Sequence, residues 1–64
     1  MVTLIEIDTE LDLPEGMKLQ VFDGDLDTAK ARFLAKHGFE CRVIYKLRNR
    51  WWMVMDPEYE VKYE

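Results

Sequence analysis

The 64-residue chain has no serine, a single cysteine and a single histidine, and these shortages remove several classes of function. One cysteine cannot form an intramolecular disulfide, and Cys41 with His37 falls short of the four ligands of a usual zinc site. The chain also lacks a serine nucleophile and a glycine-rich phosphate loop of the Walker or dinucleotide type. We therefore expect a protein that is not an enzyme and that holds neither a metal nor another cofactor.

Two short patterns resemble catalytic or metal-binding elements but are incomplete. Residues 23–27 place acids at the first, third and fifth positions of a calcium loop. Thr28 then stands where such a loop needs glycine, and Leu34 stands where it needs a bidentate glutamate. Helix capping explains these acids without a cation. His37 and Cys41 are four residues apart, but a predicted helix end falls between them, so we interpret both as structural residues.

Long apolar runs are absent as well. The longest, residues 51–55, is far shorter than the ~18 residues expected of a membrane-spanning helix. The amino terminus carries acids rather than the basic segment of a signal peptide. We predict a cytoplasmic protein without membrane contact, and an unpaired cysteine fits that compartment.

What the chain does have is apolar and aromatic content. At 48% hydrophobic residues, with two Trp, three Tyr and three Phe, it is too apolar for disorder, and residues 1–64 make one domain. A chain this short buries only about 60% of its unfolded surface. Small domains usually recruit disulfides, metals, dense aromatic packing or oligomerisation. Aromatic packing and self-association remain available here.

The charged residues are sorted along the sequence. Residues 1–29 hold eight acids and one base, a net charge of −7. Residues 30–52 hold seven bases and one acid, a net of +6, and residues 53–64 return to −3. Two interpretations follow: either the basic middle binds a ligand by charge, or the acidic arms pair with it.

Two strand-like runs lie in the amino-terminal half. Residues 2–7 are rich in β-branched side chains, and residues 17–22 alternate apolar with polar side chains. Between them, Pro14 and Gly16 mark a turn, since proline presets its φ and glycine accepts a positive φ. We predict that the two runs form an antiparallel hairpin.

A helix is predicted over residues 26–37. Leu26, Ala29, Phe33 and His37 recur at the spacing of one helical face. Acids at residues 23–25 offer an N-cap, and Gly38 stands where a left-handed C-terminal residue is wanted.

The carboxyl-terminal half predicts two more strands, over residues 41–47 and 51–55, and the alternation in residues 59–63 predicts a fifth strand at an edge. The helix between the second and third strands indicates a β-α-β crossover. The predicted class is therefore α+β, in the order β-β-α-β-β, with one helix packed on one face of a mainly antiparallel sheet.

The length of the turn near Asn49 decides which tryptophan is buried, because a one-residue shift of register exchanges the two faces. A two-residue loop, 48–49, pairs Tyr45 with Trp52 and places Trp52 beneath the helix. A three-residue loop, 48–50, buries Trp51 instead. We favour the longer loop, since arginine adopts poorly the positive φ of a two-residue type I′ turn.

With that register, an apolar strip of Ile44, Trp52 and Val54 lies on the face that the helix leaves uncovered. One helix covers one side of a small sheet, and exposed apolar strips usually mark interfaces. We therefore expect homodimerisation through this sheet face.

A basic and aromatic segment is the strongest candidate for a binding site. Protein recognition is the favoured use, because Trp, Arg, Tyr and Met are enriched in interfaces. The alternative is single-stranded nucleic acid, in which cations neutralise phosphates and tryptophan stacks on bases. A third use, an acidic decoy of nucleic acid, would rest on the amino-terminal carboxylates. The candidate binding residues are Arg42, Lys46, Arg48, Arg50 and Trp52.

Overall fold

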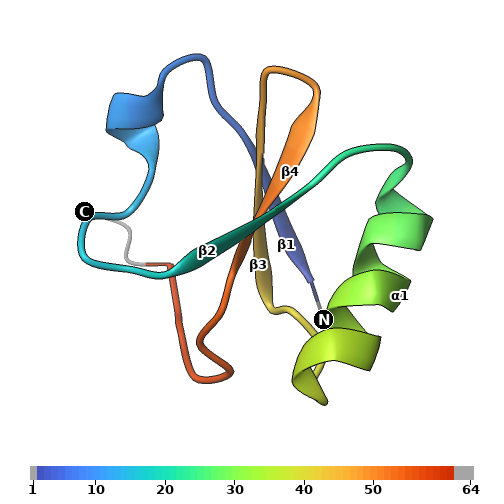
Figure 1. Cartoon of the computed structure of the whole chain (residues 1–64). Helices are drawn as coiled ribbons and strands as arrows, with labels where there is room; N and C mark the ends of the chain where they lie inside the picture. Colours follow the sequence, from blue (N-terminus) through green and yellow to red (C-terminus); the bar gives the residue numbers. More distant parts are fainter. Residues whose placement is uncertain (1, 62–64) are drawn as a thin grey trace.

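The computed structural model describes residues 2–61, which form one helix and a four-stranded mixed sheet, as the α+β prediction requires. Figure 1 shows the sheet with the helix on one side and a short 3-10 helix with the carboxyl-terminal segment on the other. The elements are β1 (Thr3–Glu6), η1 (Glu10–Asp12), β2 (Leu19–Phe22), α1 (Leu26–His37), β3 (Val43–Leu47) and β4 (Arg50–Val54).

The strands are ordered β1-β3-β4-β2, so β1 and β2 lie at opposite edges. The predicted hairpin between them is wrong. β1 instead pairs in parallel with β3, while β2 and β3 each pair antiparallel with β4. The connection over residues 7–18 includes η1 and is long enough to cross the sheet. Because β2 and β3 share an antiparallel neighbour, they run parallel to each other, as the β-α-β crossover requires.

The helix begins and ends where its caps predict. The Asp25 side chain accepts a hydrogen bond from the Thr28 backbone N–H at 3.1 Å. Gly38 closes the helix at φ 78°, and its N–H donates to the Leu34 carbonyl at 2.9 Å. The left-handed conformation at this site suits glycine, which has no Cβ to clash.

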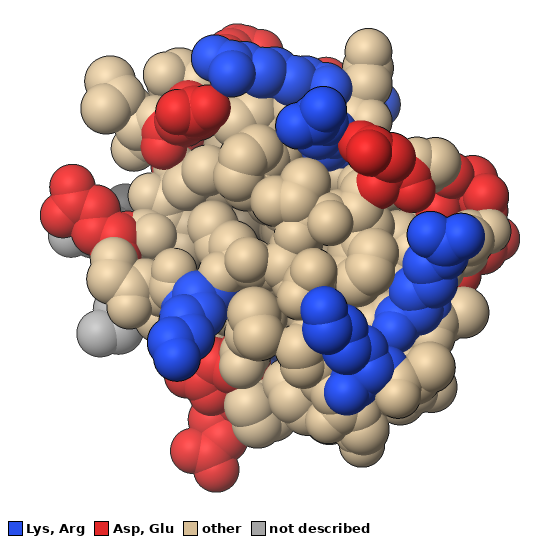
Figure 2. Space-filling view, viewed as in Figure 1, with Lys and Arg blue, Asp and Glu red and all other residues tan. Residues whose placement is uncertain are grey.

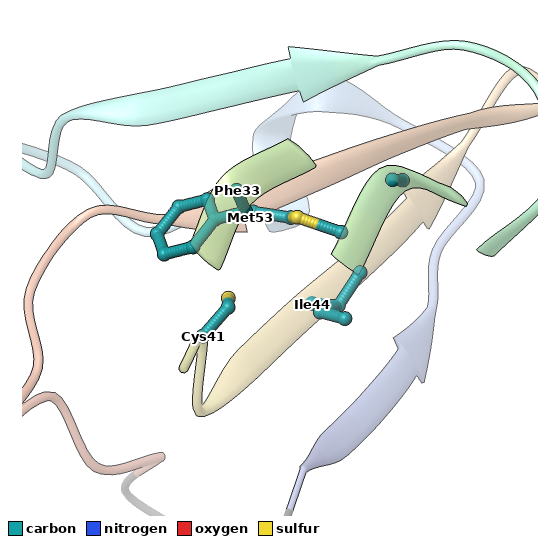
Figure 3. Packing of buried hydrophobic residues seen from close by; sticks show 5 residues of the cluster. Phe33, Cys41, Ile44 and Met53 are labelled. Carbon is teal, nitrogen blue, oxygen red and sulfur yellow. The ribbon is translucent and has the colours of Figure 1, made fainter. Parts of the chain in front are cut away.

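The sheet has an apolar cluster on each face. On the helix face, Phe33 of α1 lies against Met53 of β4, above Ile44 and Cys41 (Figure 3). Ile44 and Met53 are register partners, and both are 0% exposed. The opposite cluster centres on buried Val43, Tyr45 and Val54, against which pack partly buried apolar residues: Ile5, Ile7, Leu13, Met17, Leu19, Trp52, Tyr59 and Val61.

The β3–β4 turn has two residues, so the favoured three-residue loop is wrong. Leu47 pairs with Arg50, and Arg48 and Asn49 both adopt left-handed backbone, at φ 54° and 61°. This is the geometry of a type I′ turn, whose twist matches that of the strands. The match outweighs the cost of a positive φ at arginine.

Trp52 is nevertheless not under the helix. The residues of β3 that face α1 are even-numbered, and Ile44 rather than Tyr45 belongs to the helix-side cluster. Trp51 therefore packs on the helix side, while Trp52 lies with Tyr45 on the other face. The predicted position of Trp51 was right although the predicted loop was not, because the faces of β3 were also assigned in reverse.

The expected apolar strip in water is also wrong. Ile44 lies beneath the helix, and Val54 is 1% exposed on the opposite face. Residues of the β1–β2 connection and of the carboxyl-terminal segment cover that second face, Leu13 and Tyr59 among them. Residues 59–61 form no strand in the described structure, and the rest of the predicted fifth strand lies outside the described residues.

No helix within residues 2–61 is long and apolar enough to cross a membrane.

Candidate binding surfaces

Each arginine of the β3–β4 hairpin already faces an acidic residue. Arg48 Nη1 lies 3.1 Å from Glu10 Oε1 in η1, and Arg50 Nε lies 3.0 Å from Asp23 Oδ1 after β2. All four side chains are largely exposed, so each pair contributes only about 0–1 kcal/mol to folding. The acidic arm does pair with the basic middle, which was one of the two interpretations of the charge pattern.

Both tryptophans are engaged within the fold. Trp51 Nε1 donates to the Gly24 carbonyl at 2.8 Å, and Trp52 Nε1 donates to the Leu47 carbonyl at 3.2 Å. The Lys46 ammonium sits 5.7 Å from the centroid of the Trp51 ring. Stacking on a base needs an open ring face. One face of Trp51 carries Lys46, and Trp52 is partly buried in the cluster on the other side of the sheet.

The five residues predicted as a binding site do not form one patch. Arg42 precedes β3, at the strand end opposite the hairpin turn, and its Nη1 donates to the Pro57 carbonyl at 3.4 Å. Lys46 and Trp52 lie on opposite faces of the sheet. In the view of Figure 2, lysine and arginine side chains are scattered around an apolar centre and interrupted by acids. A continuous basic surface is not present on this face.

The acids around Gly24 serve the fold rather than a cation. Asp23 pairs with Arg50, and Asp25 accepts hydrogen bonds from both the hydroxyl and the N–H of Thr28. The Thr28 side-chain hydrogen bond is the main reason that the pKa of Asp25 falls below its usual value. Residues 2–61 contain no group of three or more acidic, cysteine or histidine side chains placed to hold a metal.

Cys41 and His37 have separate partners. Cys41 is 2% exposed, and its thiol lies 3.0 Å from the Val43 carbonyl. Burial raises the pKa of this thiol, which makes it a poor nucleophile. The His37 ring lies between Phe33 and Phe39, at centroid distances of 4.5 and 6.0 Å. Both residues belong to the packing of the helix end, as their structural interpretation predicts.

The outer edge of β1 presents unused backbone groups. Thr3 N–H donates to the Arg42 carbonyl at 2.8 Å, and Ile7 N–H donates to the Lys46 carbonyl at 3.0 Å. Backbone groups alternate in direction along a strand, so those of Leu4 and Glu6 point away from β3. No described strand lies on that side, because β1 ends the sheet. We refer to this side of β1 as the open edge.

Side-chain exposure distinguishes the open edge from the other end of the sheet. Three of the four β1 residues are exposed, whereas all four residues of β2 are partly buried. Leu4 is 49% exposed and shares the helix face with its register partner Ile44. The sequence marks β1 as a possible edge strand by its short length, but the absence of a second neighbour becomes visible only in the sheet order.

Comparison of the chain with protein-family models, with curated proteins and with solved structures found no match.

Proposed function

We propose that this protein is a non-enzymatic binding module that recognises an extended segment of a protein partner at the open edge. The observation that carries the proposal is the outward direction of the Leu4 and Glu6 backbone groups, together with the half-exposed Leu4 side chain. An added strand would satisfy those groups by main-chain hydrogen bonds, which is how strand addition supplies affinity. A buried, unpaired thiol supports placing the protein in the cytoplasm.

The side chains along the open edge supply the specificity. Leu4 lies on the helix face of the sheet, and Ile5 lies on the other face within the second apolar cluster. A segment paired with β1 would alternate its own side chains between these two faces. The half of it that lies beside Leu4 is best apolar.

The hairpin supports nucleic-acid binding less well. Arg48 and Arg50 would have to leave Glu10 and Asp23, and the overall charge of −4 repels a polyanion. Those ion pairs are weak enough to exchange, but no basic patch surrounds them on the face seen in Figure 2. We therefore move the proposed site from the hairpin to β1.

A photo-crosslinking residue at position 4 tests the proposal. Leu4→benzoylphenylalanine protein is irradiated in an extract of its source cells, and the adducts are identified by mass spectrometry. Leu11→benzoylphenylalanine is the matched control, because Leu11 is 90% exposed on η1, away from the edge. We expect a discrete protein adduct from position 4 that position 11 does not give. The same adducts from both positions, or none from position 4, would overturn the proposal.

A further inference from the structure

We infer that the strand received at the open edge is β1 of a second copy of this chain, paired antiparallel so that the two four-stranded sheets become one. The inference rests on the proposed function and names the partner. It differs from dimerisation through the sheet face, which the structure shows to be covered by residues such as Leu13 and Tyr59.

The register follows from which backbone groups point outward. In an antiparallel pair, residues that exchange two hydrogen bonds face each other with both backbones turned inward to the pair. Leu4 is the central outward-facing residue of β1, so a two-fold axis through it places Leu4 opposite Leu4 of the second copy. Both side chains lie on the helix faces of their sheets, because Leu4 shares the face of Ile44. The pairing covers a leucine that is 49% exposed in one chain.

The same register keeps like charges apart. Two residues from the axis, Glu6 faces Val2 of the second copy rather than Glu6 of the second copy. Like charges directly opposite destabilise a strand pair, so a symmetric register centred on Glu6 is disfavoured. The remaining repulsion is the long-range one between two chains of net charge −4, and salt screens it.

The size of the chain and the composition of β1 favour a second copy. A domain of 64 residues without a disulfide gains stability by oligomerisation, which is one of the few devices open to it. Edge strands that stay unpaired are usually protected by lysine, proline or a bulge. β1 has the sequence Thr-Leu-Ile-Glu, which contains neither lysine nor proline, and its pairing with β3 runs without interruption.

Sedimentation velocity of the purified chain tests the inference. We expect the wild-type protein to dimerise reversibly as its concentration rises to millimolar, and more tightly at high salt. Leu4→Lys places two ammonium groups opposite each other and should raise the dimer dissociation constant by roughly tenfold or more. Leu11→Lys, the same change of charge on η1, should leave it unchanged.

A mixing experiment separates a broken contact from a damaged fold. Leu4→Lys and Leu4→Glu variants should each be monomeric, and an equimolar mixture should dimerise, because opposite charges then meet across the two-fold axis. A folded wild-type chain that stays monomeric at millimolar concentration would overturn the inference, as would a dimer that Leu4→Lys leaves intact. If position 4 still crosslinks to a different protein, the proposed function survives that failure.

Discussion

Trp51 and Gly24 are joined by a 2.8 Å hydrogen bond from the indole Nε1 to the backbone carbonyl, which ties β4 to the loop that starts the helix. The residues are far apart in sequence, and the loop also holds Asp23, whose carboxylate pairs with Arg50. The basic-aromatic segment therefore fastens the hairpin to the β2–α1 loop.

Replacing Trp51 by Phe tests this fastening. The substitution removes the indole donor and leaves the Gly24 carbonyl without its partner, while an aromatic ring still packs on the helix side. We expect the free energy of unfolding to fall by about 1 kcal/mol or somewhat more, measured by urea denaturation. Arg48→Gln, which removes only an exposed ion pair, is the control and should cost less. An unchanged midpoint for Trp51→Phe would show that the hydrogen bond contributes little.

The Asp25 cap gives a prediction with a defined pH dependence. Its carboxylate accepts two hydrogen bonds from Thr28, which lower its pKa in the folded state. A carboxyl with a lowered folded pKa stabilises the fold above its unfolded pKa, and this contribution is lost as the pH falls through the folded pKa. Asp25→Ala should therefore lower the thermal midpoint at neutral pH and lose its effect in acid.

Asp25→Asn is the matched control, because asparagine also caps helices well. Thermal unfolding followed by circular dichroism at several pH values should show a smaller loss for asparagine than for alanine at neutral pH. Equal losses for the two variants, or a loss that does not shrink in acid, would contradict the capping role.

Cys41 should resist thiol reagents in the folded protein. The side chain is buried, and desolvation is the main cause that raises the pKa of its thiol. We expect labelling by Ellman's reagent to be slow in buffer and fast in denaturant. A group whose folded pKa is raised contributes stability that is present below its unfolded pKa and is lost as the pH rises above it. Stability should thus fall in alkali less for Cys41→Ala than for wild type, and rapid labelling of the native protein would contradict the burial.

Charge reversal at the hairpin compares the two uses of the basic segment. If the arginines serve the fold, wild-type protein should not bind labelled single- or double-stranded oligonucleotides saturably at low salt, in a fluorescence-anisotropy titration. Binding that weakens with salt and disappears in Arg48→Glu/Arg50→Glu would instead restore the nucleic-acid hypothesis and place its site at the hairpin.

The sequence predicted the elements better than their arrangement. The α1 boundaries were clear because Asp25 and Gly38 are local signals that need no knowledge of the rest of the chain. The position of β1 was not, because a short strand next to a turn fits a hairpin as well as it fits a parallel edge. Only the packing of residues 7–18 across the sheet chooses between the two.

The candidate site was harder to predict, for a related reason. Arginine disfavours positive φ, yet Arg48 adopts it because a type I′ turn suits the twist of β3 and β4. The pairing of Arg48 with Glu10 joins residues distant in the sequence, so charge segregation alone could not separate pairing from ligand binding. The open edge of β1 depends on the sheet order and leaves no signature in the residue types.

Amide hydrogen exchange at β1, followed by NMR, tests the open edge most directly. Ile5 N–H points toward β3 and should be protected in every sample, whereas Leu4 and Glu6 N–H should exchange rapidly in dilute protein. At millimolar concentration, or with a crosslinked partner identified from position 4, we expect Leu4 and Glu6 to become protected together. If both stay fast-exchanging in the associated protein, the edge is not where it binds.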